Sequence, residues 1–209
     1  MGFAYGDVID NLRRAYDAKV DERDDHATEA WKVEERARFL ALLRAEGIGA
    51  LLDIGSGPGV HAQYFADEGL AVTCVDLSPA MAARCRERSF AAYEQDVLGL
   101  QLPRRFGAAF AMNSLLHVPP ADLHAALERI RGVLAPGALF YLGQYGGIAF
   151  EGPYPSDHYE PKRYFSRLTD EDLRAVVSGS FTVVDFHQVE VGADHDFGHF
   201  QAFVLRAPS

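Results

Sequence analysis

The stretch LLDIGSGPGVHAQYFADEGLAVTCVDLS, residues 51–78, decides the fold class. It begins with an apolar run and passes through a turn with three glycines in five positions. Residues 61–68 follow with apolar positions at helical spacing, and a second apolar run, residues 71–76, ends on an aspartate. This order predicts a parallel strand–helix–strand unit with the glycine-rich turn at the carboxyl end of its first strand.

The same alternation of segments continues along the chain. The strand-like runs are residues 50–54, 71–76, 90–96, 106–113 and 138–145, and the helical candidates are residues 61–68, 80–88 and 120–134. Later, Thr169 is placed to cap a helix, and residues 181–191 and 198–207 alternate as antiparallel strands do. We therefore expect an α/β fold: a doubly wound, mostly parallel seven-stranded sheet with helices on both faces and a C-terminal antiparallel hairpin.

We expect a single domain, residues 1–209, because the length suits one core and no linker divides the chain. Residues 7–45 have helical spacing on either side of a charged gap, residues 19–32, which reads as a loop or a mobile segment. Residues 146–168 are rich in glycine, proline and aromatic residues and look too irregular for a core element. We interpret them as a substrate-loop insertion, since long irregular loops in compact domains are often functional.

Composition limits the function classes. The chain has 20 Lys and Arg against 30 Asp and Glu, a formal net charge of −10, which argues against a protein that binds nucleic-acid phosphates. No signal peptide and no membrane-spanning run is found, so we expect a cytoplasmic protein with no membrane partner. Cys74 and Cys85 lack the spacing of metal or redox pairs and are expected to be reduced packing residues.

The glycine-rich turn predicts a ligand with a nucleoside. The turn would place backbone N–H groups and a helix N-terminus at the sheet edge, and Asp76 at the next strand end can accept both hydroxyls of a ribose. A dinucleotide-binding turn has the pattern GxGxxG, whereas Gly55, Gly57 and Gly59 form GxGxG and position 60 is valine. The displaced third glycine favours another adenosine cofactor over a nicotinamide dinucleotide.

Together with Asp53, the turn D-I-G-S-G-P-G resembles motif I of the class I S-adenosylmethionine-dependent methyltransferases. The resemblance extends over nearly the whole chain, to EQDV after the third strand, FAMNSLLHVP at the fourth, and the Pro-Gly turn before the fifth. It implies a Rossmann-like sheet, S-adenosyl-L-methionine as cofactor, and N-terminal helices, residues 1–46, that close over it as a lid.

The resemblance also implies a role for each matching residue. Asp76 would hold the ribose, Asp96 would face the adenine amino group, and Asn113 would border the methionine end. Tyr16 resembles the tyrosine that many members place near the methionine carboxylate. The cofactor-binding residues implied are Tyr16, Asp53, Gly55, Ser56, Gly57, Gly59, Asp76, Leu77, Asp96, Val97, Asn113 and Ser114.

Methyl transfer from a sulfonium requires alignment more than a conspicuous catalytic group. His117 is the candidate base, because it follows the fourth strand and an ordinary imidazole titrates near neutral pH; a purely structural histidine is the open alternative. Tyr145, at the end of the fifth strand, is the second catalytic candidate. The late histidines His187, His195 and His199 have no ligand spacing, so no metal is expected.

The acceptor is expected to be a small molecule rather than nucleic acid, since Asn113 is followed by Ser-Leu-Leu and not by the Pro-Pro-Tyr used for exocyclic amines. The insertion adds polar and aromatic side chains that could wall an aromatic or otherwise apolar acceptor, or could simply form a surface loop. These are Tyr154, His158, Tyr159, Arg163 and Tyr164.

A nicotinamide-dependent oxidoreductase and a non-catalytic S-adenosylmethionine-binding protein remain alternatives. The sequence identifies neither the acceptor nor the oligomeric state.

Overall fold

The structure is a computed structural model that describes residues 3–24, 28–191 and 198–209. Its helices are α1 (Tyr5–Asp17), α2 (Val20–Asp24), α3 (Ala30–Ala45), α4 (Val60–Asp67), α5 (Pro79–Glu87), the 3-10 turn η1 (Leu115–His117), α6 (Pro120–Gly132) and α7 (Asp170–Ser178). Its strands are β1 (Ala50–Ile54), β2 (Ala71–Asp76), β3 (Ala91–Glu94), β4 (Phe106–Met112), β5 (Leu134–Gly146), β6 (Phe150–Pro153), β7 (Tyr164–Arg167), β8 (Thr182–Val189) and β9 (His199–Arg206).

Seven strands form one sheet in the order β3-β2-β1-β4-β5-β9-β8. The pairs from β3 to β5 are parallel, whereas β9 runs antiparallel to both β5 and β8. The predicted doubly wound sheet and its C-terminal antiparallel hairpin are therefore confirmed. The chain order reverses between β1 and β4, and ligands of such sheets bind beyond the carboxyl ends of the strands at this point.

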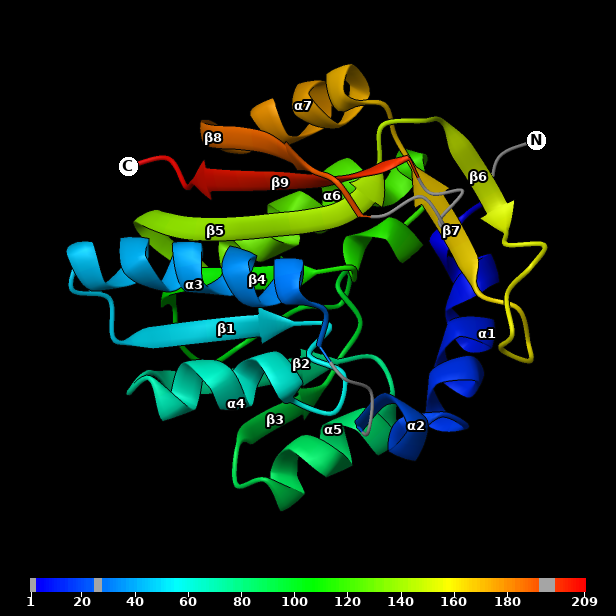
Figure 1. The fold of residues 1–209 in the computed structure, drawn as a ribbon, viewed down its shortest axis with the longest axis horizontal. Coiled ribbons are helices and arrows are strands. Elements are labelled where there is room, and N and C mark those ends of the chain that lie inside the picture. The colour runs from blue at the N-terminus through cyan, green and yellow to red at the C-terminus, as the bar shows by residue number, and fades with distance from the viewer. Residues whose placement is uncertain (1–2, 25–27, 192–197) are drawn as a thin grey trace.

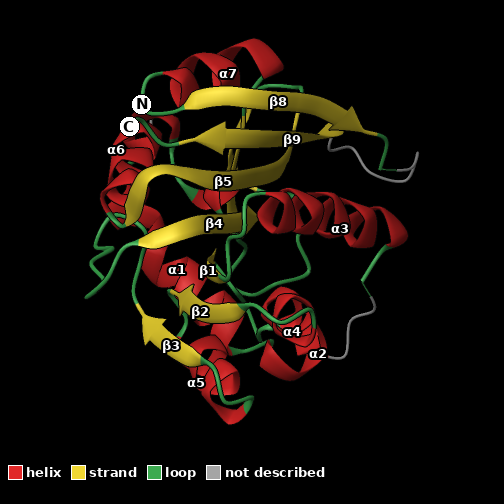
Figure 2. Ribbon diagram, turned by 90° about the vertical axis from the view of Figure 1, so that its left-hand side faces the viewer, coloured by secondary structure: helices red, strands yellow, loops and turns green. Residues whose placement is uncertain are grey.

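Helices cover both faces of the sheet, as Figure 2 shows from the side. On one face, α3 and α4 pack buried residues such as Phe39 and Phe65 against the strands. On the other, α1, α6 and α7 contribute residues such as Leu12, Leu127 and Leu173. The near-continuous burial of β4 and β5 follows from this double cover, because a parallel strand has no solvent-facing side.

Elements from distant parts of the sequence gather at the carboxyl edge of the sheet, where the arrow of β1 points in Figure 1. They are α1 and α2 from the N-terminus and the β6–β7 hairpin. Charged groups hold the N-terminal helices to α5: Asp17 accepts a hydrogen bond from the Ser78 hydroxyl at 2.5 Å, and Arg84 pairs with Asp21 at 2.6 Å and with Asp24.

The structure corrects three expectations about single segments. The insertion at residues 146–168 is not irregular throughout, because β6 and β7 pair as a two-stranded antiparallel sheet. The charged gap at residues 19–32 contains the helix α2. The helix predicted to reach residue 134 ends at Gly132, and the Pro-Gly turn lies inside β5, where the pairing with β4 shifts register.

Among the described residues, no helix is both long enough and apolar enough to cross a bilayer.

Candidate active site

The glycine-rich turn leads from β1 into α4. The backbone N–H groups of Gly55 and Ser56 donate to the Val75 carbonyl of β2 at 2.8 and 3.1 Å, which binds the turn to the neighbouring strand. Gly55 has a φ of +68°, and a Cβ at this position would lie 2.3 Å from the Cβ of Ser114. Gly59 is the N-cap of α4 with a φ of +91°, and a Cβ there would lie 3.2 Å from the Cys85 sulfur. These positions require glycine.

Asp76 closes β2 next to this turn. One carboxylate oxygen accepts from the Gly57 N–H at 2.8 Å and the other from the Ser78 N–H at 2.9 Å. The side chain is buried, which raises its pKa above the ordinary value, although both hydrogen bonds oppose that shift. Each oxygen keeps a further lone pair, so this carboxylate can still accept from a ligand hydroxyl.

Asp53 lies on β1 behind the turn and outside the cavity linings. Its side chain is buried and accepts a hydrogen bond from the backbone of Ala62, whereas Oδ2 has no partner among the described residues. Burial raises its pKa well above the usual value, with the Cys85 thiol and Asp76 adding to the shift. Its position supports a role in fixing α4 to β1 rather than direct contact with a cofactor.

We expect Asp53→Asn to change how stability depends on pH. Because the folded-state pKa of Asp53 is raised above the unfolded value, the wild type loses stability as pH rises between those two values. The isosteric amide removes this titration, so the variant is expected to have a higher Tm than the wild type at pH 8 and nearly the same Tm at pH 4. Thermal melts at both pH values test this, with the exposed Asp10→Asn as control; equal shifts at both pH values would contradict it.

Three adjoining cavities run along the carboxyl edge of the sheet. The largest, about 260 Å³, lies over the glycine-rich turn between α2, α3 and the β6–β7 loop. A central cavity of about 60 Å³ shares Arg23, Gly55, Gly57 and Met112 with it. A third, about 40 Å³, extends past Asp76 toward β3. Because the linings overlap, the three form one continuous trough across β4, β1 and β2.

Most of the residues predicted from sequence line this trough. The central and third cavities are lined by Tyr16, Gly55, Gly57, Asp76, Leu77, Asp96, Val97, Asn113, Ser114 and His117, and the largest also by Ser56. Asp53, Gly59 and Tyr145 do not line it. Gly59 instead supports the turn from behind, against Cys85.

Tyr145 lies on the face of β5 that packs against α3. Its ring contacts Trp31 and Phe200 with centroid distances of 6.1 and 5.7 Å, and burial raises its pKa to about 12. A phenol in this position holds α3 to the sheet. The structure therefore does not bring Tyr145 together with the other predicted catalytic residue, and Trp31 packs in the core.

His117 lies at the centre of the trough with both ring nitrogens engaged. Nδ1 is 2.6 Å from the Tyr164 carbonyl oxygen, and Nε2 is 2.5 Å from the Tyr16 hydroxyl. Burial, together with the positive charge of Arg163, lowers its pKa to about 3. The expectation that this imidazole titrates near neutral pH is wrong, because the neutral ring is enclosed between α1 and β7.

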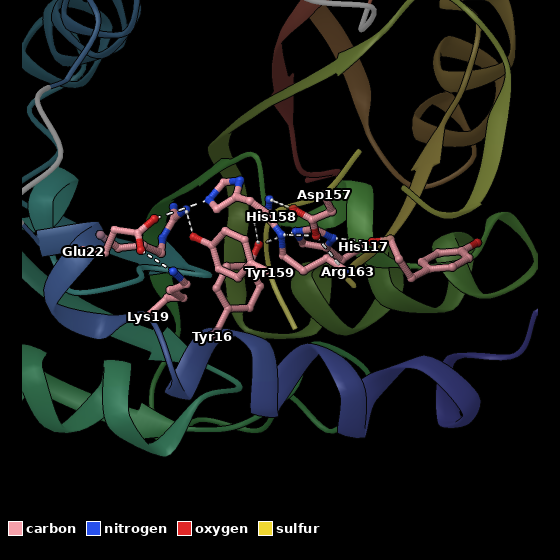
Figure 3. A network of polar contacts seen from close by, with 10 residues as sticks. Tyr16, Lys19, Glu22, His117, Asp157, His158, Tyr159 and Arg163 are labelled. Carbon is pink, nitrogen blue, oxygen red and sulfur yellow. Dashed lines mark hydrogen bonds and ion pairs between the residues drawn. The ribbon is translucent and has the colours of Figure 1, made fainter. Parts of the chain in front are cut away.

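The β6–β7 loop reaches α1 through Arg163, as Figure 3 shows. Asp157, buried in the loop, accepts from Arg163 at 2.8 and 2.9 Å, and the guanidinium stacks over Tyr159 at 3.6 Å. Tyr159 and Arg163 line the largest cavity together with His158; of the other predicted wall residues, Tyr154 and Tyr164 do not. The remaining lining is mainly charged and polar, so the expected apolar acceptor wall is not what the structure presents.

Arg23 of α2 is a site residue that the sequence interpretation missed. It lines both the largest and the central cavities, its guanidinium lies 5.4 Å from the centre of the Tyr16 ring, and it donates to the Tyr159 hydroxyl at 3.5 Å. Among the described residues it forms no ion pair with a carboxylate. A guanidinium that lines the cavity wall in this way is suited to an anionic ligand group.

Of the late histidines, His187 and His199 form hydrogen bonds to Glu35 and Asp170. His195 lies outside the described residues. No cluster with the makeup of a metal site occurs in the described part of the chain.

Residues 51–137 match a family model described as a methyltransferase domain. These residues, which make up less than half of the chain, are similar to a methyltransferase domain. No curated sequence matched the chain in the corresponding comparison. The match covers the glycine-rich turn, Asp76, Asp96 and the Asn113 segment, which are the motifs on which the sequence interpretation rested.

Solved structures that are less than 25% identical in sequence share the fold of the chain. The 1,6-didemethyltoxoflavin-N1-methyltransferase of Burkholderia thailandensis, with bound 1,6-didemethyltoxoflavin and S-adenosylhomocysteine, is 23% identical, with a TM-score of 0.70 over 96% of this chain and 88% of that one. The N-methyltransferase NodS of Bradyrhizobium japonicum, in complex with S-adenosylhomocysteine, is 17% identical, with a TM-score of 0.69 over 96% and 100%. The [4+2]-cyclase SpnF is 20% identical, with a TM-score of 0.60 over 77% and 75%.

The trough fits the methyl donor. Asn113 Oδ1 and Ser114 Oγ are buried and have no partner among the described residues, so both are available to a ligand. Gly55 and Gly57 leave backbone exposed beside them, and Asp76 and Asp96 add carboxylates further along. The backbone and amide groups suit the amino-acid part of S-adenosylmethionine, and the two carboxylates further along suit its ribose and adenine parts.

Proposed function

We propose that the protein transfers the methyl group of S-adenosylmethionine to a small polar acceptor and releases S-adenosylhomocysteine. The observation that carries this proposal is the continuous trough, with Asp76 between a narrow end at Asp96 and a wide end at the glycine-rich turn. The narrow end suits a nucleoside. The wide end, about 260 Å³, leaves room for a second molecule.

Each part of the methyl donor has a proposed partner. The adenine would lie in the third cavity, beside Val97 and Leu77 and with its amino group toward Asp96. Asp76 would accept from the ribose hydroxyls. The methionine part would pass Asn113 and the glycine-rich turn. Its carboxylate would then point toward α2. The bound cofactor supplies an electrophilic methyl group for in-line displacement.

The protein's own contribution is position and exclusion of water. Helices α1 and α2 and the β6–β7 loop are held over the trough by the Tyr16, Tyr159 and Arg163 contacts, which supports the proposal that residues 1–46 act as a lid and residues 146–168 bind substrate. Because the sulfonium charge disappears during transfer, exclusion of water from the site favours the reaction. We propose that residues 1–209 belong to a single methyltransferase domain.

We further propose that Arg23 binds the methionine carboxylate. Arg23→Met is expected to weaken S-adenosylmethionine binding about 10- to 100-fold, since hydrogen bonds to charged groups contribute about 1.5–3 kcal/mol. Binding of 5′-methylthioadenosine, which lacks the amino-acid end, is expected to change less than about threefold. Calorimetric titration of both ligands tests this, with Arg86→Met on the outer face of α5 as control.

An equal loss for the two ligands would contradict a carboxylate contact. It would show that Arg23 acts by holding α2 in place through Tyr16 and Tyr159 rather than by binding the ligand.

Turnover needs its own test, because SpnF shows that this fold also carries other chemistry. Purified protein is incubated with S-adenosylmethionine and a set of small molecules, and S-adenosylhomocysteine is measured by mass spectrometry. Acceptor-dependent product supports the proposed function. Binding without product across a wide acceptor set would favour the non-catalytic alternative, and binding of NADH with no binding of S-adenosylmethionine would favour the oxidoreductase.

A small-molecule acceptor, the absence of a nucleic-acid partner and a cytoplasmic location stay predictions.

A further inference from the structure

Arg163 is held in place by three neighbours and still keeps unused N–H donors. Its Nε and Nη2 donate to the two oxygens of Asp157 at 2.9 and 2.8 Å. The guanidinium carbon lies 3.6 Å from the centroid of the Tyr159 ring, and Nη1 donates to the Tyr16 hydroxyl at 3.4 Å. Figure 3 shows these groups around Arg163. Because a guanidinium has five N–H groups, one on Nη1 and one on Nη2 have no partner among the described residues.

The unused donors belong to the wide end of the trough. Arg163 lines the largest cavity and neither of the other two, whereas Arg23 lines both the largest and the central cavity. The Arg163 side chain is only 14% exposed, and a donor enclosed to this extent costs free energy unless a ligand accepts from it. Two N–H groups of one guanidinium match the two oxygens of a carboxylate, whereas the NH2 group of a primary amide would bring a donor against a donor.

The charges around the largest cavity also favour an anionic ligand group. The charged residues of its lining are Arg23, Lys32, Arg163, Glu22 and Glu29. Both acids already have cationic partners, since Lys32 lies 2.7 Å from Glu29 and Lys19 lies 2.5 Å from Glu22. His158 also contacts Glu22, at 3.4 Å. The two acids are therefore compensated within the wall, and the cations remain in excess.

The His61 imidazole in the same wall responds to this balance of charge. Its pKa is lowered to about 3, first by burial and then by nearby arginine and lysine side chains, and the opposing effect of Glu29 is smaller. The electrostatic potential at this wall is therefore positive, in spite of the two acids and of the negative net charge of the chain.

We propose that the methyl acceptor carries a carboxylate group, which accepts hydrogen bonds from Nη1 and Nη2 of Arg163 in the largest cavity. The inference rests on the proposed function. The methionine carboxylate of the cofactor is assigned to Arg23, so each of the two arginines binds one anionic group. The largest and the central cavity adjoin, so an acceptor held at Arg163 can reach the methyl group on the methionine part.

The first test compares carboxylic acids with their amides. The protein, saturated with S-adenosylhomocysteine, is titrated with matched pairs, and binding is followed by ligand-observed NMR. The pairs are benzoate and benzamide, 4-hydroxybenzoate and 4-hydroxybenzamide, and N-acetylglycine and N-acetylglycinamide. Each acid is expected to bind at least about tenfold more tightly than its amide. Equal binding within each pair, or no binding of any acid, would overturn the inference.

The second test asks whether Arg163 is the group that prefers the acid. The double variant Asp157→Asn/Arg163→Gln replaces the ion pair by two amides, so that no buried charge is left unpaired, and the acid-to-amide affinity ratio is expected to fall below about twofold. Asp157→Asn alone keeps the guanidinium and is expected to retain the ratio. Arg174→Gln, at an arginine that stacks on Phe186 outside the trough, is the matched control. Thermal melts establish that each variant folds.

A ratio that persists in the double variant but is lost in Lys32→Gln would place the carboxylate at Lys32 and overturn the inference. Loss of the ratio in Asp157→Asn alone would also overturn it, because the order of the loop rather than the guanidinium would then set the preference.

The cofactor provides the last distinction. The Kd for S-adenosylmethionine, measured by calorimetry, is expected to change less than about twofold in the double variant. A loss of at least about tenfold, with the acid-to-amide ratio intact, would show that Arg163 binds the methionine carboxylate; the inference would fail and the proposed methyl transfer would stand. Failure of the wild type to bind S-adenosylmethionine would instead contradict the proposed function itself.

Discussion

Gly55→Ala is expected to abolish measurable S-adenosylmethionine binding and to lower the free energy of unfolding by about 2–4 kcal/mol, or about 5–15 °C in Tm. Two costs add. An L-residue at a φ of +68° is strained, and the new methyl group would lie 2.3 Å from Ser114 Cβ, so the segment that follows β4 must move. That movement displaces Ser114 from two of the three cavities.

Gly69→Ala isolates the first of these costs. Gly69 also has a positive φ, +91°, but a Cβ there meets nothing within 4 Å. This variant is expected to lose about 1–2 kcal/mol and to keep its cofactor affinity. Calorimetry and thermal melts on both variants test the account; undiminished binding by Gly55→Ala would show that the β1–α4 turn and the segment after β4 do not meet around the ligand.

Asp76→Ala is expected to weaken S-adenosylmethionine binding at least about 100-fold. The carboxylate is proposed to accept from two ribose hydroxyls, and hydrogen bonds to charged groups contribute about 1.5–3 kcal/mol each. The substitution also frees the N–H groups of Gly57 and Ser78, which loosens the turn that faces the methionine part.

Two comparisons make the result specific to the ribose. Asp10→Ala, an exposed acid on α1, is expected to bind normally. The ligand 2′-deoxyadenosine is expected to compete less well than adenosine with the wild type but equally well with Asp76→Ala. An unchanged Kd in Asp76→Ala, measured by calorimetry, would disprove the ribose assignment.

The sheet was predictable because its signals are local. Residues 50–54 and 71–76 form β1 and β2 as predicted, since each is a short apolar run bounded by turn residues. Asp76 and the glycines of the turn could be placed on the same grounds. Their roles depend on where a strand ends, and strand ends are visible in sequence.

Features that depend on tertiary contacts were not predictable in the same way. The pKa of His117 is lowered by enclosure between α1 and β7, which lie far from it in sequence. Arg23 lies in a charged segment that reads as a loop, and only the fold places its guanidinium in the trough. β6, with the sequence Phe-Glu-Gly-Pro, has no strand-like alternation, and pairing with β7 defines it.

The packing role of Tyr145 could have been predicted from the alternation of side chains along its strand. Side chains alternate across a strand, so Tyr145 shares a face of β5 with Leu139 and Tyr141. Both of these pack in the apolar layer beneath α3 and α4, and so does Tyr145. Strand parity therefore predicts a packing role for this tyrosine, independent of its place at the end of β5.

A calorimetric titration of the wild-type protein with S-adenosylmethionine, S-adenosylhomocysteine and NADH tests the central claim most directly. The account predicts saturable binding of both sulfur ligands at one site per chain and no heat from NADH. Binding of NADH, or no binding of either sulfur ligand by a folded protein, would contradict it.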